Sequence, residues 1–183
     1  MSTATVTILG TAVLAAMLPL SAQTSLPRTS RDVSTDHVKL RMSLSEPTVA
    51  PGGRVSLVLE IEPRRRMHVY APGATDYRVI TLTTAPQPFI RLPPVRYPAS
   101  DIYFFAPLNE GVPVYQKLFT LRQDVILEDT PQARGAFGST RQLTLIGTLA
   151  YQACDDQICF NPVSVPLSWT VGLRPSTAAP SNR

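Results

Sequence analysis

Hydrophobic and polar side chains alternate with a period of two through much of the chain. In residues 38–44 the apolar side chains Val38, Leu40, Met42 and Leu44 are separated by charged or polar ones. Successive side chains of a strand point to opposite faces, so this period predicts strands with one buried face. Comparable apolar stretches predict further strands at residues 55–61, 67–70, 79–83, 115–126, 143–151 and 163–171.

Turn-forming residues separate these stretches at short intervals. Pro51-Gly52-Gly53 and Ala71-Pro72-Gly73 are examples, and the 183 residues include 18 prolines. Proline interrupts helix interiors, so a helical bundle is disfavoured. Residues 132–140 contain two glycines and are expected to form a loop, and no helix is predicted. The predicted fold is therefore an all-β, antiparallel β-sandwich.

The two ends of the chain differ in composition from this domain. Residues 1–22 carry no charged side chain and include an apolar run at 6–20, which is typical of a signal peptide. That run is shorter than the ~20 residues of a membrane span. We expect a polar linker at 23–36, the β-sandwich domain at 37–173 and a disordered tail at 174–183. The expected location is the periplasm or the exterior of the cell.

The charge balance excludes some classes of protein. There are 17 Lys and Arg against 13 Asp and Glu, and the single basic run is Arg64-Arg65-Arg66. A nucleic-acid partner is not expected, because such binders concentrate positive charge among aromatic side chains. A hydrolase is also disfavoured, since His37 and His68 are the two histidines and neither belongs to a recognisable triad.

The two cysteines, Cys154 and Cys159, lie in a C-x4-C arrangement between two predicted strands. Two thiols are too few for a disulfide-dense scaffold or a complete thiolate zinc site. Outside the cytoplasm they are expected to pair, since disulfides persist there. Residues facing each other across a strand pair have Cβ atoms about 4.5–5.5 Å apart, which makes a disulfide at the neck of the hairpin feasible.

A disulfide at this position would stabilise the fold only weakly. Chain-entropy arithmetic for so short a loop gives about 2 kcal/mol. A bond on a surface turn is accessible to a partner thiolate and therefore suited to exchange. Asp155 and Asp156 disfavour a thiolate on the adjacent Cys154, as suits a disulfide awaiting attack. The spacing alone leaves both an exchanging and an ordinary structural disulfide open.

Three segments of the chain resemble a known family. Residues 151–154, 159–162 and 165–167 read Tyr-Gln-Ala-Cys, Cys-Phe-Asn-Pro and Val-Pro-Leu. They are similar to the active-site hairpin of the N-terminal domain of the DsbD thiol:disulfide interchange family. Residues 67–73 and 97–121 resemble the family's aromatic strand and the segment that carries its cap loop.

The resemblance implies an immunoglobulin-like periplasmic domain with a redox pair, Cys154 and Cys159, and no cofactor or metal. It implies that Cys159 attacks partner disulfides and that His68 and Tyr70 line the site. The implied cap loop comprises Asp101, Ile102, Tyr103, Phe104 and Phe105. Because the cap segment is longer than in the family, through Asn109 and Glu110, its capping aromatic is left open among Tyr103, Phe104 and Phe105.

The family also implies partners and a reaction. Its full-length members receive electrons from a membrane domain and a thioredoxin-like domain, neither of which follows here. The expected donor is therefore a separate membrane protein or a thioredoxin-like protein, and the expected acceptors are periplasmic thiol proteins. No nucleic acid and no stable membrane insertion after signal cleavage are expected. The activity would be that of a thiol:disulfide oxidoreductase of the protein-disulfide reductase type.

Two other functions compete with this prediction. One is a secreted binding module in which the disulfide is purely structural, for which a very low reduction potential is expected. The other is a copper-binding protein that uses Cys154, Cys159, His68 and Met67, because soft sulfur ligands suit Cu(I). The sequence has no Met- or His-rich tract to favour the copper-binding alternative.

Overall fold

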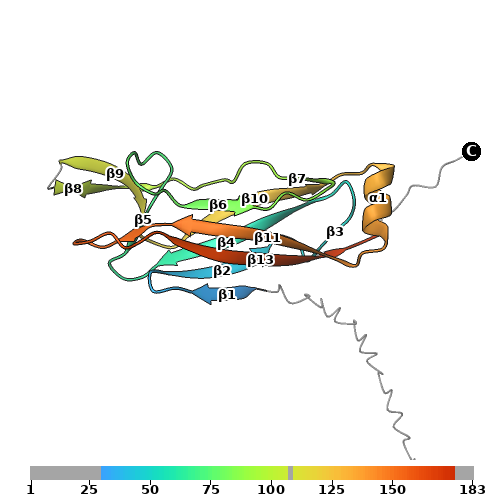
Figure 1. The fold of residues 1–183 in the computed structure, drawn as a ribbon, viewed down its shortest axis with the longest axis horizontal. Helices are drawn as coiled ribbons and strands as arrows, with labels where there is room; N and C mark the ends of the chain where they lie inside the picture. Colours follow the sequence, from blue (N-terminus) through green and yellow to red (C-terminus); the bar gives the residue numbers. More distant parts are fainter. Residues whose placement is uncertain (1–29, 107–108, 176–183) are drawn as a thin grey trace, which may run out of the picture.

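A computed structural model describes residues 30–106 and 109–175 (Figure 1). Two sheets form the sandwich. The first sheet has the order β1-β2-β4-β10-β7. Its strands are β1 (Arg31–Ser34), β2 (Val38–Leu44), β4 (Arg54–Pro63), β10 (Phe119–Leu127) and β7 (Ile90–Arg91). The second sheet has the order β3-β13-β11-β6. Its strands are β3 (Thr48–Val49), β13 (Val163–Leu173), β11 (Gln142–Tyr151) and β6 (Thr81–Thr84).

The hydrophobic core contains side chains of both sheets. Leu40 and Leu59 of the first sheet and Leu149 and Trp169 of the second belong to one buried cluster. In β2 the buried residues alternate with exposed ones along most of the strand, as the period of two requires. The strand pairs are antiparallel apart from β3 with β13. The predicted all-β, immunoglobulin-like sandwich is confirmed.

A third, smaller sheet lies at one end of the molecule, opposite the helix α1 (Pro131–Gly138) (Figure 1). It has the order β12-β5-β9-β8. Its strands are β12 (Ala153–Cys154), β5 (His68–Tyr70), β9 (Glu110–Tyr115) and β8 (Asp101–Phe105). Because β12 follows β11 after one residue and β5 follows β4 after a short turn, the small sheet continues strands of the sandwich. The sandwich therefore positions β12 and β5, which carry Cys154, His68 and Tyr70.

The prediction of a loop at residues 132–140 is wrong, because Pro131–Gly138 form the helix α1. The side chain of Thr130 caps the helix by accepting the backbone N–H of Ala133, and a proline occupies the first turn. Both features favour a helix start. The two glycines suggested a loop, but the cap and the burial of Ala133 outweigh their effect.

The single strand predicted at residues 115–126 is also wrong, because it is divided between two sheets. Strand β9 ends at Tyr115 and β10 begins at Phe119. The chain leaves the small sheet and enters the sandwich between these residues, whose rings stack with centroids 4.0 Å apart. The period of two continues through both strands, so the sequence pattern does not show that the chain passes from one sheet to another.

The segment predicted as a polar linker, residues 23–36, contains β1, which pairs with β2 and packs Val33 against the core. The predicted signal peptide, residues 1–22, lies outside the described residues, as does the tail from residue 176. Among the residues that the structure describes, no helix has the length and apolar character needed to cross a membrane.

Asp124 of β10 holds a charged network at the edge of the core. Its carboxylate accepts two hydrogen bonds of 2.9 Å from Arg96 and one of 2.7 Å from the hydroxyl of Ser56. Arg96 and Ser56 lower the pKa of Asp124 to about 2. The folded-state pKa lies below the unfolded value, so the stabilisation is present above pH ~4 and is lost as the pH falls through 2.

We expect Asp124→Asn to lower the free energy of unfolding by about 2 kcal/mol at pH 7 and by much less at pH 2. Urea unfolding at both pH values measures this difference. Asp32→Asn is the control, because Asp32 pairs with Arg41 on the exposed surface. Loss of the Asp32–Arg41 ion pair should lower the free energy of unfolding by less than about 1 kcal/mol at either pH. Equal effects of the two substitutions at pH 7 would contradict the assignment.

Candidate functional site

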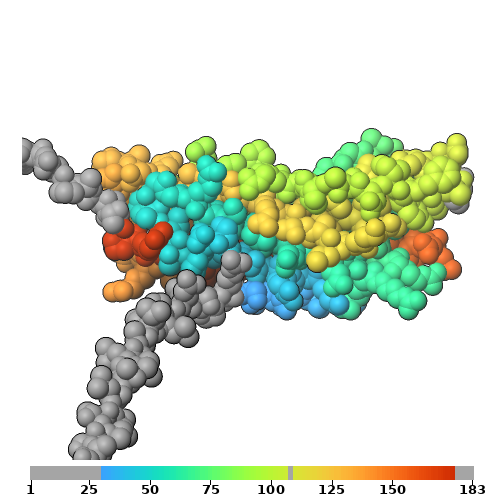
Figure 2. Space-filling model, turned by 180° about the vertical axis from the view of Figure 1, so that it is seen from behind, coloured from blue at the N-terminus to red at the C-terminus, as the bar shows by residue number. Residues whose placement is uncertain are grey.

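Cys154 and Cys159 are joined by a disulfide, with Cα atoms 4.0 Å apart, so the predicted pairing is confirmed. Cys154 ends β12, where it lies opposite His68 of β5. Cys159 returns along the hairpin and forms an isolated bridge with Cys154. The hairpin projects at the end of the molecule that also carries β8 and β9 (Figure 2).

The carboxylate of Asp155 orders the loop between the two cysteines. Its Oδ1 atom accepts the backbone N–H groups of Gln157 at 2.7 Å and Ile158 at 2.8 Å. These two hydrogen bonds lower the pKa of Asp155. At the base of the loop, the N–H of Phe160 donates to the carbonyl of Ala153 at 2.9 Å. The loop therefore presents the disulfide in a defined conformation.

The two sulfur-bearing residues differ in exposure. Cys154 is 1% exposed and belongs to a small buried cluster with Tyr70, Val112 and Val114. Cys159 is exposed. A thiolate from another protein can therefore approach Cys159, whereas the fold shields Cys154.

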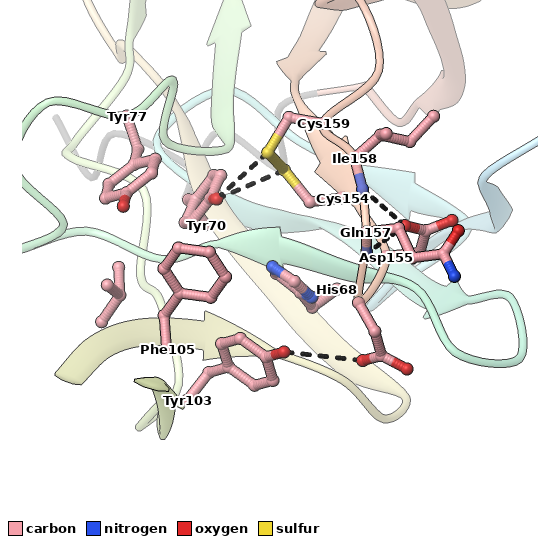
Figure 3. Close-up of a pocket in the computed structure, with 12 residues that line it drawn as sticks. His68, Tyr70, Tyr77, Tyr103, Phe105, Cys154, Asp155, Gln157, Ile158 and Cys159 are labelled. Carbon is pink, nitrogen blue, oxygen red and sulfur yellow. Dashed lines mark hydrogen bonds between the residues drawn. A yellow bond between two sulfur atoms is a disulfide. The ribbon is translucent and has the colours of Figure 1, made fainter. Parts of the chain in front are cut away.

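The hydroxyl of Tyr70 lies against both sulfur atoms (Figure 3). Its oxygen is 3.2 Å from Sγ of Cys154 and 3.4 Å from Sγ of Cys159. Disulfide sulfurs carry no hydrogen, so the hydroxyl is the donor and its one proton is shared between them. Burial, with smaller contributions from Tyr77 and Glu110, raises the pKa of Tyr70 to about 12, so this donor persists throughout the neutral range.

The disulfide forms part of the wall of a cavity of about 110 Å³. Aromatic side chains from three other segments supply half of the remaining lining residues (Figure 3). The lining residues are His68, Tyr70, Tyr77, Tyr103, Phe105, Val112 and residues 154–159.

His68 is 3% exposed and lies between aromatic rings. It stacks on Tyr103 with centroids 4.7 Å apart and meets the ring of Tyr70 at 5.5 Å, edge to face. Burial lowers the pKa of His68, although the charges of Asp156 and Asp155 partly oppose this shift. The imidazole is therefore predominantly neutral at pH 7.

The predicted cap residues form the strand β8 rather than a loop, with side chains on two faces. Tyr103 and Phe105 line the cavity. Ile102 and Phe104 are 66% and 60% exposed and do not line it, and neither does Asp101. The alternation of a strand thus separates the three candidate aromatics. Tyr103 and Phe105 face the cavity, and Phe104 does not.

No protein-family model and no curated protein matches the chain. Among solved structures, it is similar to the N-terminal periplasmic domain of ScsB from Proteus mirabilis. The two share 14% identity with a TM-score of 0.48, over 82% of this chain and 52% of that chain. The chain therefore spans about half the length of that structure. The fold is established by the strands of this chain, and the function proposed below is supported by the geometry of its own site.

Sequence reasoning missed several residues of the site, among them Tyr77, Ile158 and Arg66. Tyr77 stacks on Tyr70 with centroids 4.2 Å apart, but it follows β5 in an irregular segment where no periodicity indicates its direction. Ile158 is 56% exposed beside the disulfide, and an isoleucine in a polar hairpin loop was a signal that could have found it. Arg66, from the basic run, pairs with Asp156 at 3.3 Å. It offsets one of the two acidic charges beside Cys154.

Proposed function

We propose that this protein exchanges its Cys154–Cys159 disulfide with the thiols of partner proteins and so carries electrons between them. The observation that carries the proposal is the asymmetry of the disulfide. Cys159 is exposed, whereas Cys154 is 1% exposed. The Tyr70 hydroxyl lies 3.2 Å from the sulfur of Cys154 and 3.4 Å from that of Cys159, so it can stabilise the buried sulfur as it leaves. Exchange requires an accessible sulfur to be attacked and a leaving sulfur that is stabilised, and this arrangement supports both roles.

The reaction proceeds through a mixed disulfide. A partner thiolate attacks Sγ of Cys159, the Cys154–Cys159 bond breaks, and its electron pair passes to Sγ of Cys154. The partner's second thiolate then attacks the partner's own sulfur in the mixed disulfide and releases Cys159 as a thiolate. The partner is oxidised to a disulfide, and this protein is reduced by two electrons. The same steps in reverse reduce the disulfide of an acceptor protein.

In this proposal the partners are of two kinds. A membrane electron donor or a thioredoxin-like protein reduces the disulfide, and thiol proteins of the periplasm or cell exterior are reduced in turn. Tyr103 and Phe105 line the same cavity from the β8 side, and a docking partner would contact them there. The reaction requires no cofactor.

The reduction potential of the Cys154–Cys159 pair tests the proposal. We expect a value between about −270 and −120 mV, the range of exchanging protein dithiols. The folded protein would be equilibrated in glutathione and dithiothreitol buffers, and its free thiols would be trapped with a maleimide and counted by mass. A potential below about −300 mV would instead identify a structural disulfide and overturn the proposal.

The copper-binding alternative rests on the sequence alone. Within residues 30–106 and 109–175 there is no group of three or more His, Cys, Asp or Glu side chains placed to hold a metal ion.

A further inference from the structure

His68 lies directly opposite Cys154 in the pairing of β5 with β12. Residues paired in this way point to the same face and have Cβ atoms about 4.5–5.5 Å apart. Both residues line the cavity, and the ring nitrogens of His68 form no hydrogen bond with the other lining residues (Figure 3). The imidazole therefore lies beside the residue that carries the leaving sulfur, and no lining residue forms a hydrogen bond with its nitrogens.

Opening the disulfide creates a charge that the site must accommodate. The electron pair passes to Cys154, which is 1% exposed, and burying an unpaired anion is costly. Tyr70 can donate a hydrogen bond to this sulfur, but its pKa of about 12 prevents it from giving up the proton at neutral pH. A second group must supply a proton if the thiolate is to become a thiol.

The other titratable groups around the cavity are poorly suited to this task. Backbone N–H groups hold Asp155 in its ionised form by lowering its pKa. Asp156 lies between Arg66 at 3.3 Å and the hydroxyl of Tyr103 at 3.5 Å. The hydroxyl of Tyr77 donates to Glu110, and burial raises the pKa values of the Tyr70 and Tyr77 phenols. An imidazole changes charge between about pH 5 and 8, which leaves His68 among the lining residues.

We propose that His68 is the proton relay of the exchange reaction: its imidazole receives the proton released by the incoming thiol and delivers it to Sγ of Cys154 as the disulfide opens. This inference rests on the proposed function. One proton moves from the partner thiol to Cys154, and His68 returns to its neutral form. In the reverse reaction His68 removes the proton from the Cys154 thiol, so that the thiolate can attack the mixed disulfide and release the partner.

The first test is the pH dependence of reduction by dithiothreitol between pH 5 and 8.5. Each rate constant is divided by the concentration of dithiothreitol thiolate at that pH, which removes the titration of the reagent. A rise of the corrected constant at low pH then reports a proton donor in the protein. We expect the wild-type constant to increase at least tenfold as the pH falls, because general-acid catalysis typically contributes about 100-fold or more. The constant of His68→Gln should change less than about twofold over this range.

His37→Gln is the matched control. His37 packs against Phe160 beside the hairpin, with ring centroids 4.6 Å apart, and does not line the cavity. Its substitution should preserve the wild-type pH profile. If His68 acted only by packing on Tyr103, His68→Gln would shift the rate by the same factor at every pH, and that result would overturn the relay.

The second test requires no change at His68. The protein has two histidines, so the spectrum of His37→Gln assigns the His68 resonances in an NMR titration. The pKa of His68 should rise when the disulfide is reduced, because the sulfur of Cys154 can then carry a negative charge beside it. A titration unchanged by reduction would overturn the relay even if His68→Gln failed to fold.

Failure of the relay can be distinguished from failure of the proposed function. If the reduction potential lies in the exchanging range but the wild-type protein and His68→Gln have the same pH profile, the proposed electron-carrier function stands and the proton relay is overturned. A reduction potential below the exchanging range would overturn the proposed electron-carrier function, whatever the pH profile.

Discussion

Cys154→Ser is expected to form a stable mixed disulfide through Cys159, whereas folded Cys159→Ser is expected to react far more slowly. In Cys154→Ser the remaining thiol lies on the exposed residue, and no second thiol is present to release the partner. In Cys159→Ser the remaining thiol belongs to Cys154, which is 1% exposed. Exchange rates follow access to the sulfur, so we expect a difference of at least tenfold.

Oxidised glutathione provides a simple probe for this prediction. Each folded variant is incubated with it, and the gain of one glutathione is followed by intact mass. The same measurement in concentrated urea is the control, because unfolding exposes both thiols and should make the two rates similar. If the folded variants reacted equally fast, accessibility would not distinguish the cysteines, and the asymmetry behind the proposed function would be lost.

Tyr70→Phe is expected to slow reduction of the disulfide by roughly 10- to 100-fold. The substitution preserves the ring that stacks on Tyr77 and removes the hydroxyl that lies 3.2 Å from Sγ of Cys154. A hydrogen bond to a charged group contributes about 1.5–3 kcal/mol, and the charge appears on this sulfur as the bond opens. Because the pKa of Tyr70 is about 12, the slowing should be similar at all pH values between 5 and 9.

Tyr77→Phe is the matched control for Tyr70→Phe. Tyr77 lines the same cavity and stacks on the same ring, but its hydroxyl donates to Glu110 and not to sulfur. We expect it to react with dithiothreitol within about threefold of the wild-type rate, as for a surface hydrogen bond of modest strength. Equal slowing by both substitutions would show that Tyr70 acts through packing.

Tyr70 and His68 have separate roles in this scheme, and the two substitutions separate them. The hydroxyl stabilises the leaving sulfur without changing charge. The imidazole changes charge within the working pH range. Substitution of Tyr70 should therefore lower the rate by the same factor at every pH. Substitution of His68 should remove the pH dependence of the rate.

The period of two carried most of the information about the fold. It predicted strands β2, β4, β11 and β13 near their observed positions and placed Val38, Leu40 and Met42 in the core. A strand with one face in a core must alternate, so this signal is local and strong. It failed at α1, where a Thr130 cap outweighed two glycines, and between Tyr115 and Phe119, where the chain changes sheet.

The site was partly predictable. The short hairpin made a bond between Cys154 and Cys159 feasible, and the resemblance of residues 67–73 to the family's aromatic strand implied His68 and Tyr70 at the site. Tyr77 lies in an irregular segment, so no pattern connects it with the disulfide. The choice among Tyr103, Phe104 and Phe105 required knowing that β8 is a strand and which of its faces meets the cavity.

The amino-acid sequence by itself determined that this is a β-sandwich with a disulfide in a hairpin, because alternation and short spacing act between neighbours along the chain. Only the tertiary structure decided which sulfur is accessible and which side chains surround it. Burial of Cys154, the position of the Tyr70 hydroxyl and the placement of His68 opposite Cys154 depend on the pairing of β5 with β12, whose residues are more than 80 positions apart. Such contacts result from how the core brings distant strands together, and no local pattern encodes them.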